Sequence, residues 1–145
     1  MKIIGLYGRA GCGKSETLNR LKELLRSAGK SISSEPHPWC ESPETFEFKG
    51  RIICVAPAGD TSEIVETNCD YFESKKCDVA ISATRTKWGS VDALTDFARR
   101  KKTEIDWVEK SYEYWLSKEI QTLCNKEMSE VLFNQICDYF NNMSK

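Results

Sequence analysis

Residues 2–15 of the chain read KIIGLYGRAGCGKS. The first six are mostly apolar and rich in Ile and Leu, which is typical of a strand covered on both faces. After this stretch, four leucines recur at helical spacing, and Gly29 stands where a helix C-cap is expected. The pattern therefore predicts a strand over residues 2–7, a glycine-rich turn, and a helix over residues 14–28.

The rest of the chain continues this alternation. Apolar runs predict strands over residues 51–56, 79–83 and 104–108, with a short strand around 31–33; helical periodicity predicts helices over 62–75, 90–102 and 111–141. The last stretch is one helix or two in tandem, and its expected inner face consists of Leu116, Ile120, Leu123, Val131, Leu132, Ile136 and Phe140. The expected fold is α/β in three layers, with a mainly parallel sheet of four or five strands, flanking helices and a long C-terminal helix.

Composition excludes several classes of protein. The chain has 145 residues, with 21 Lys and Arg against 22 Asp and Glu, and this length predicts a single domain over residues 1–145. The near-neutral charge disfavours a nucleic-acid partner. The apolar runs are too short to span a membrane, and the start lacks the features of a signal peptide. We therefore expect a cytoplasmic protein with no membrane partner.

Cysteine and histidine do not indicate a metal centre. The seven cysteines stand at positions 12, 40, 54, 69, 77, 124 and 137 without a CxxC pair, and His37 lies alone between two prolines. A zinc site needs paired spacing. In a reducing compartment these cysteines are expected to be small core residues.

The strongest motif is G-x-x-x-x-G-K-[ST], which residues 8–15 match without a gap. Glycines allow successive N–H groups to curl around a phosphate, and the helix that follows adds its positive N-terminal end. Lys14 can neutralise the β- and γ-phosphates, and the Ser15 hydroxyl can bind Mg²⁺. Cys12, inside the motif, is expected to face away from the phosphates.

Through this motif, known as Walker A, the sequence resembles the P-loop NTPase superfamily, and loosely its nucleoside and nucleotide kinase branch. The specific likeness covers about fourteen N-terminal residues; beyond them only the alternating α/β plan is shared. The resemblance implies a P-loop nucleotide-binding domain that takes ATP or GTP with Mg²⁺. The phosphates would lie against Gly8, Arg9, Ala10, Gly11, Cys12, Gly13, Lys14 and Ser15.

The acidic residue that such proteins place at the end of an apolar strand is missing from its usual position. The strand over residues 51–56 ends in Pro57, and the nearest acid is Asp60. Asp60 could bind Mg²⁺ or act as a base. It could equally cap the following helix, with Glu63 completing a capping box. Asp78 precedes its strand, which puts it at the wrong end of a parallel sheet.

Ligands of open parallel sheets bind beyond the carboxyl ends of the strands. At that edge, after the strand over 79–83, the sequence places Arg85, Lys87 and Trp88. The two cations could contact phosphate, and Trp88 could stack on a base. The alternative is a surface loop in which Ser90 caps a helix.

Three further segments have simpler interpretations. The basic run at residues 99–102 is expected to be a solvated helix end. The proline-rich stretch 35–43, with Glu35, His37 and Trp39, could line an acceptor pocket or form a rigid connection. The aromatic residues at 107, 112, 114 and 115 are expected to be packing residues.

Two nucleotide-dependent functions remain open, beside that of a pure interaction domain with a vestigial P-loop. One is a small Mg²⁺-dependent phosphotransferase in which Lys14, Arg85 and Asp60 act on the transferred phosphoryl group, with an unidentified small-molecule acceptor. The other is a nucleotide-binding regulator or NTPase whose state a protein partner reads. The segment between the last two predicted strands leaves little room for a lid, and this weakens the hypothesis of a phosphotransferase. The N-K-x-D base signature is absent, so ATP is somewhat favoured over GTP.

Overall fold

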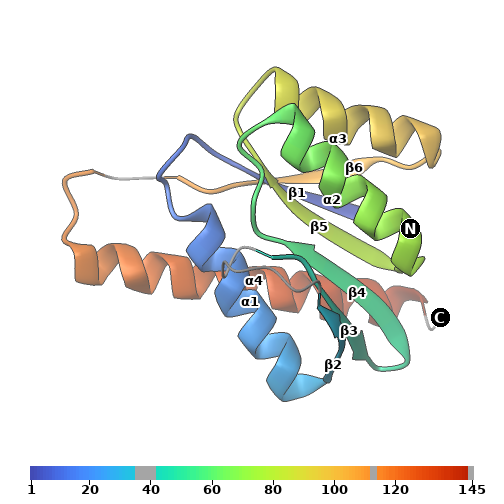
Figure 1. The fold of residues 1–145 in the computed structure, drawn as a ribbon. Coiled ribbons are helices and arrows are strands. Elements are labelled where there is room, and N and C mark those ends of the chain that lie inside the picture. The colour runs from blue at the N-terminus through green and yellow to red at the C-terminus, as the bar shows by residue number, and fades with distance from the viewer. Residues whose placement is uncertain (35–41, 112–113, 144–145) are drawn as a thin grey trace.

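The computed structural model describes residues 1–34, 42–111 and 114–143. Within these ranges the chain forms one six-stranded sheet in the order β2-β3-β4-β5-β1-β6 (Figure 1). The strands are β1 (Lys2–Tyr7), β2 (Lys30–Ser34), β3 (Glu44–Phe48), β4 (Arg51–Ala56), β5 (Val79–Thr84) and β6 (Ile105–Glu109). The helices are α1 (Lys14–Ala28), α2 (Ser62–Lys75), α3 (Gly89–Arg100) and α4 (Lys118–Met143).

The sheet is mixed but mostly parallel. β4, β5, β1 and β6 are neighbours and run in the same direction, whereas β3 pairs antiparallel with both β2 and β4. The prediction of four or five strands was therefore wrong by one: residues 44–48, for which no strand was predicted, pair between two predicted strands. Tyr7 lies opposite Thr84 and Glu109, so the carboxyl ends of β1, β5 and β6 meet at one edge.

Helices cover both faces of the sheet, which confirms the predicted three layers. On one face, leucines of α1 and apolar residues of α4 pack with Ile4, Leu6 and Ile53. On the other, α2 and α3 pack against Ile3, Cys54 and Ala80. In Figure 1, α1 and α4 lie on one side of the strands and α2 and α3 on the opposite side. β1, β4, β5 and β6 are each followed by a helix, and the site lies where the connections from β1, β4 and β5 begin.

The C-terminal helix differs from its prediction. It begins at Lys118 rather than near residue 111, and is a single helix up to Met143. Its buried residues are Asn125, Ser129, Leu132, Ile136 and Phe140. Ile120, Leu123 and Val131 were predicted to face inward but are about half exposed. The prediction was wrong because the first buried residues of α4 are the polar Asn125 and Ser129. Apolar character therefore did not mark the inner face of this helix near its N-terminus.

Other predicted features of packing were partly correct. Of the described cysteines, Cys12, Cys54, Cys69 and Cys77 are buried, and Cys124 and Cys137 are half-buried; Cys40 lies outside the described residues. Trp115 and Tyr114 are about two-thirds exposed or more, so the prediction that they are packing residues was wrong. In the described part of the chain, no helix combines the length and apolar character needed to cross a membrane.

Candidate functional site

The glycine-rich loop, residues 8–13, joins the end of β1 to the start of α1. Gly11 and Gly13 have φ of +78° and +100°, in the left-handed region that favours glycine. Gly13 is the N-cap of α1, and no side chain among the described residues caps this helix. The N–H groups of its first turn therefore point toward the loop, where they favour an anion.

Lys14 folds back over this loop. Its Nζ donates to the carbonyl oxygens of Gly8 at 2.5 Å and Arg9 at 3.0 Å. The residue is only 6% exposed. Burial lowers the pKa of Lys14 below its ordinary value, and the negative charge of Asp60 partly opposes this effect. The loop thus contains a buried cation beside free backbone donors.

Ser15, the next residue, connects the loop to the strand two places along the sheet. Its Oγ donates to the carbonyl of Pro57 at 3.3 Å, just beyond β4. A cavity of about 330 Å³, here called the Asp60 cavity, opens between these segments. It is lined by Gly11, Gly13, Lys14, Ser15, Glu16 and Asp60. Arg9 and Ala10 are exposed at the tip of the loop and Cys12 is buried.

Asp60 does not cap α2. Thr61 does so instead, because its Oγ1 accepts from the N–H of Ile64 at 3.2 Å. The alternative that Asp60 and Glu63 form a capping box was therefore wrong. The Asp60 carboxylate faces the Asp60 cavity, and its Oδ1 lies 3.8 Å from Nε of Arg85. The structure brings together the predicted Lys14, Ser15, Asp60 and Arg85.

The turn that carries Asp60 is fixed by Asn68 of α2. The Asn68 amide donates to the carbonyl of Ala58 at 2.8 Å and to Oγ of Ser82 at 3.1 Å. Asn68 and Ser82 are both buried. These bonds tie the turn to the end of β5, which is the strand next to β1. Asp60, which follows β4 in the chain, is therefore held near the end of the neighbouring strand β5, where the sequence alone predicted no acid.

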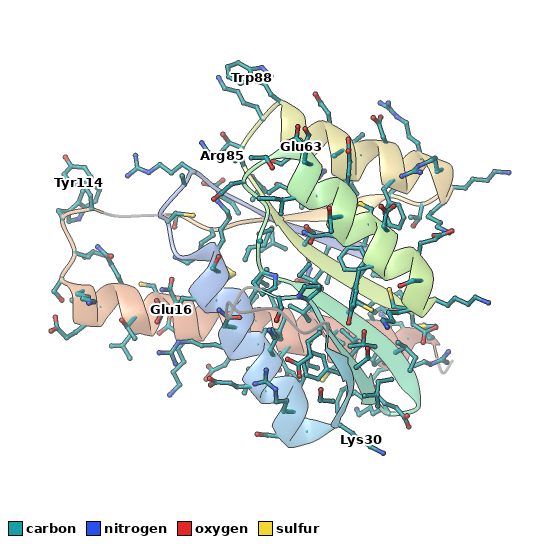
Figure 2. The ribbon with its side chains drawn as sticks, viewed as in Figure 1. Glu16, Lys30, Glu63, Arg85, Trp88 and Tyr114 are labelled. Atoms are coloured by element: carbon teal, nitrogen blue, oxygen red, sulfur yellow. The ribbon has the colours of Figure 1, made fainter. Side chains whose placement is uncertain are left out.

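Arg85 follows β5 directly, and its N–H donates to Oγ of Ser90 at 2.9 Å. Ser90 thus holds the turn, and the alternative in which it caps the helix was wrong: α3 begins at Gly89 without a side-chain cap among the described residues. Trp88 is 71% exposed with φ of +68°, and the Lys87 ammonium lies 4.4 Å from its ring. Figure 2 shows Arg85 and Trp88 at the same end of the molecule.

Several other candidates are kept away from this site. Asp78 lies at the opposite edge, where its Oδ2 accepts from the N–H of Ile52 at 2.8 Å. The basic run at 99–102 is a solvated helix end, as predicted: Arg99 pairs with Asp96, and Lys101 with Glu73. Glu35, His37 and Trp39 lie outside the described residues.

Two residues near the loop were missed. Asn125 of α4 is 4% exposed; its Nδ2 donates to Oε2 of Glu16 at 2.7 Å. Its Oδ1 would stand 2.5 Å from a Cβ on Gly13, so a larger residue at 13 would displace it. Lys110, just after β6, is 6% exposed. Asn125 lies on the same helical face as the buried Leu132 and Ile136, and this spacing could have indicated that it is buried. Nothing in the sequence indicated that Lys110 is buried.

Among residues 1–34, 42–111 and 114–143, no cluster of three or more His, Cys, Asp or Glu side chains is arranged to hold a metal ion. Comparison with protein-family models, with curated proteins and with solved structures gave no match to the chain.

Proposed function

We propose that the chain binds a nucleoside triphosphate, ATP or GTP, with its polyphosphate against residues 8–15, and that it acts as a small Mg²⁺-dependent phosphotransferase. The fold proposed with this function is of the P-loop type. The observation that carries the proposal is the buried Lys14 ammonium, held by the Gly8 and Arg9 carbonyls inside a loop that opens an uncapped helix. Such a loop offers donors and positive charge but no negative side chain, as a polyphosphate requires.

The residues around the loop fit a magnesium ion that arrives with the nucleotide. Mg²⁺ in phosphate sites takes one or two protein oxygens, phosphate oxygens and waters. The Ser15 hydroxyl and the Asp60 carboxylate line the same cavity, and they are the oxygens that would hold it. Bound there, the ion would neutralise charge on the terminal phosphates.

The transfer itself depends on positioning and charge. Lys14 would exchange its loop carbonyls for phosphate oxygens, and Arg85 would stabilise the charge that spreads over the transferred phosphoryl group. Arg85 is half exposed and only 3.8 Å from Asp60, so it can turn toward a ligand. Asp60 could alternatively accept the proton of an acceptor hydroxyl.

One observation favours a second candidate, a nucleotide-binding regulator or NTPase without a small-molecule acceptor. Between the end of β5 at Thr84 and the start of β6 at Ile105, α3 occupies most of the chain and packs against α2. This connection therefore does not provide a lid that would exclude water from the transferred phosphate.

Binding is tested by thermal unfolding with Mg²⁺-ATP and Mg²⁺-GTP. At a nucleotide concentration of about a hundred times Kd, the wild type should gain about 9 °C in Tm. Lys14→Met should abolish the shift, and Lys30→Met, which removes an exposed lysine far from the loop (Figure 2), should keep it. If neither nucleotide shifts the wild-type Tm, the proposed function is wrong.

Phosphotransfer is separated from hydrolysis by measuring ATP and GTP consumption with a panel of nucleosides, nucleotides and small hydroxylated metabolites. Turnover that requires one acceptor supports the phosphotransferase. Slow release of inorganic phosphate that no acceptor changes supports the regulator or NTPase. In either case Arg85→Ala should reduce the rate more than it reduces binding, because its charge acts on the transition state.

A further inference from the structure

A second cavity, of about 310 Å³, lies beside the carboxyl ends of β1 and β6. It is here called the Trp107 cavity, and it is lined by Tyr7 of β1, Trp107 of β6, Val91 of α3 and Thr86. Sites for small molecules have volumes of about 300–1,000 Å³ and are lined mainly by apolar and aromatic side chains with a few polar groups. The Trp107 cavity has this size and this kind of lining, and none of its four side chains is charged.

The Trp107 cavity adjoins the proposed phosphate site along the chain. Tyr7 directly precedes Gly8 of the glycine-rich loop, and Thr86 directly follows Arg85. The N–H of Gly8 donates to the last carbonyl of β5 at 3.3 Å, which keeps the ends of β1 and β5 together. Nε of Arg85 lies 3.8 Å from Oδ1 of Asp60. The segments that form the phosphate site therefore continue into the wall of this cavity.

The indole of Trp107 is held by packing and still partly open to solvent. Trp107 lies opposite Gly5 of β1, and a Cβ on Gly5 would stand 2.6 and 2.7 Å from Cζ3 and Cε3 of the indole. The indole can pack against the strand at this point because residue 5 has no side chain. The residue is nevertheless 39% exposed, so part of its ring system is available to a ligand in the cavity.

Tyr7 supplies a second ring in a fixed orientation. Its ring centroid lies 6.0 Å from that of Trp107, at an interplanar angle of 83°. The Tyr7 hydroxyl donates to Oε2 of Glu109 at 3.1 Å, and its oxygen can still accept a hydrogen bond. The Thr86 hydroxyl can donate and accept. A planar aromatic ring that enters the cavity can stack on one of the two rings and meet the other edge to face, an arrangement that a saturated ring cannot use.

We propose that the Trp107 cavity binds the phosphoryl acceptor, and that this acceptor is an uncharged compound with a planar aromatic ring and an alcohol hydroxyl group. The two perpendicular rings favour the aromatic ring, and the uncharged lining favours a neutral compound. The role as acceptor rests on the proposed function, whereas the binding of an aromatic ring does not.

The transfer that follows from this placement conserves atoms and charge. The hydroxyl oxygen of the acceptor forms a bond to the γ-phosphorus of the nucleotide, and the bond from that phosphorus to the bridging oxygen breaks. The nucleoside diphosphate leaves with the electron pair of the broken bond. The hydroxyl proton passes to the Asp60 carboxylate, which faces the neighbouring Asp60 cavity.

The experiment compares benzyl alcohol with cyclohexylmethanol, which has the same hydroxymethyl group on a saturated, puckered ring. Binding to the full chain is followed by NMR through the indole N–H resonances, and Trp107→Phe identifies the resonance of Trp107. Benzyl alcohol should shift the resonance of Trp107 and not that of the exposed Trp115. It should bind about threefold tighter than cyclohexylmethanol or more, because aromatic pairing adds to the burial of apolar surface.

Val91→Phe fills the cavity from α3 at a half-buried position and should abolish the binding of benzyl alcohol. Val131→Phe makes the same change at an exposed position of α4 and is the matched control, which should keep the binding. Any acceptor that supports phosphotransfer should lose its turnover in Val91→Phe and keep it in Val131→Phe. If Val91→Phe fails to fold, the comparison of the two alcohols on the wild type still decides whether the cavity selects an aromatic ring.

Equal affinity for the two alcohols, or shifts that leave the Trp107 resonance unchanged, would overturn this inference and leave the proposed function standing. A Trp107 resonance that moves on dilution of the protein alone would also overturn it, because a second copy of the chain would then cover the cavity. An acceptor that Val91→Phe and the wild type phosphorylate equally well would place the acceptor elsewhere. If Mg²⁺-ATP and Mg²⁺-GTP both fail to shift the Tm, the proposed function and the acceptor role are wrong, and the NMR comparison still tests the binding of an aromatic ring.

Discussion

Gly59 and Ala83 are in backbone contact: a Cβ on Gly59 would collide with the carbonyl oxygen and carbon of Ala83. Gly59 belongs to the turn that carries Asp60, and Ala83 is the penultimate residue of β5. Through this contact the turn packs against the end of β5, and the hydrogen bonds of Asn68 hold it at the same place. Only glycine permits this approach.

Gly59→Ala should therefore lower the free energy of unfolding by about 2 kcal/mol, the usual range for overpacking against backbone that cannot move. Urea unfolding followed by circular dichroism measures the change. Gly89→Ala is the control, because a Cβ there meets only ordinary contacts at 3.5 Å and beyond. Equal stability of Gly59→Ala and the wild type would show that the turn is not held against β5.

The lowered pKa of Lys14 predicts how the proposed affinity for a nucleotide depends on pH. Phosphate binding needs the ammonium, and burial brings the pKa of Lys14 below its ordinary 10.5. Affinity is then complete below the lowered pKa and is lost as the pH rises through it. Calorimetric titrations between pH 7 and 10 should show this loss beginning below the range of an exposed lysine.

Lys14→Arg provides the comparison, since a guanidinium stays charged throughout this range. Its affinity should be lower than that of the wild type but less dependent on pH. A pH dependence identical in the two proteins would assign the loss to other groups.

Glu44 should make folding sensitive to acid. Its carboxylate accepts from Nε and Nη2 of Arg26 at 3.0 and 2.6 Å, and from Oγ of Ser31 at 2.7 Å. Burial alone would raise the pKa of Glu44, but these bonds and the charges of Arg26 and Lys22 lower it overall. Its contribution to stability is therefore present above pH 4.5 and is lost as the pH falls through the lowered value.

Glu44→Gln should reduce the free energy of unfolding by about 2 kcal/mol at pH 7 and by less at pH 3. Urea unfolding at the two pH values measures the difference. Glu47→Gln, on the exposed side of the same strand, should change stability little at either. An effect of Glu44→Gln that is the same at both pH values would contradict the assignment.

Trp88 is a strained residue. Its φ of +68° with ψ of −140° lies in a region that is nearly restricted to glycine, and such residues cost about 1–3 kcal/mol. Because the side chain is 71% exposed, little packing is lost on its removal. Trp88→Gly should raise the free energy of unfolding by about 1 kcal/mol in urea.

Trp115→Gly removes a similarly exposed tryptophan and should give no such gain. Destabilisation by Trp88→Gly would mean that contacts of the indole, including that of Lys87, outweigh the backbone strain. Measuring nucleotide affinity on the stabilised variant then tests whether the strain serves the site.

The sequence was most informative where the pattern of neighbouring residues alone determines the local structure. The strand, glycine turn and helix over residues 2–28 were predicted almost to the residue, because buried strands and amphipathic helices have distinct periods. β3 was missed although Phe46 and Phe48 alternate with polar residues, because two glutamates made this five-residue stretch resemble a loop. The pairing with β2 and β4 that stabilises it is not local.

The site was predictable in part for the same reason. Residues 8–15 form a contiguous motif, and Arg85 follows a recognisable strand. Asp60 could not be assigned, because whether it caps a helix or faces a cavity depends on Thr61 and on the distant Asn68. Asn125 and Lys110 come within reach of the loop only through the packing of α4 and the pairing of β6, which no spacing in the chain encodes.

The bonds from Lys14 to the carbonyls of Gly8 and Arg9 join the start of α1 to the start of the glycine-rich loop. The ammonium places positive charge inside the loop, and its two hydrogen bonds hold the loop in its curved conformation. The phosphate of the proposed nucleotide would then take the place of these carbonyls as the partner of Lys14, instead of ordering a collapsed segment. Association should accordingly proceed in one kinetic phase, at a rate proportional to nucleotide concentration.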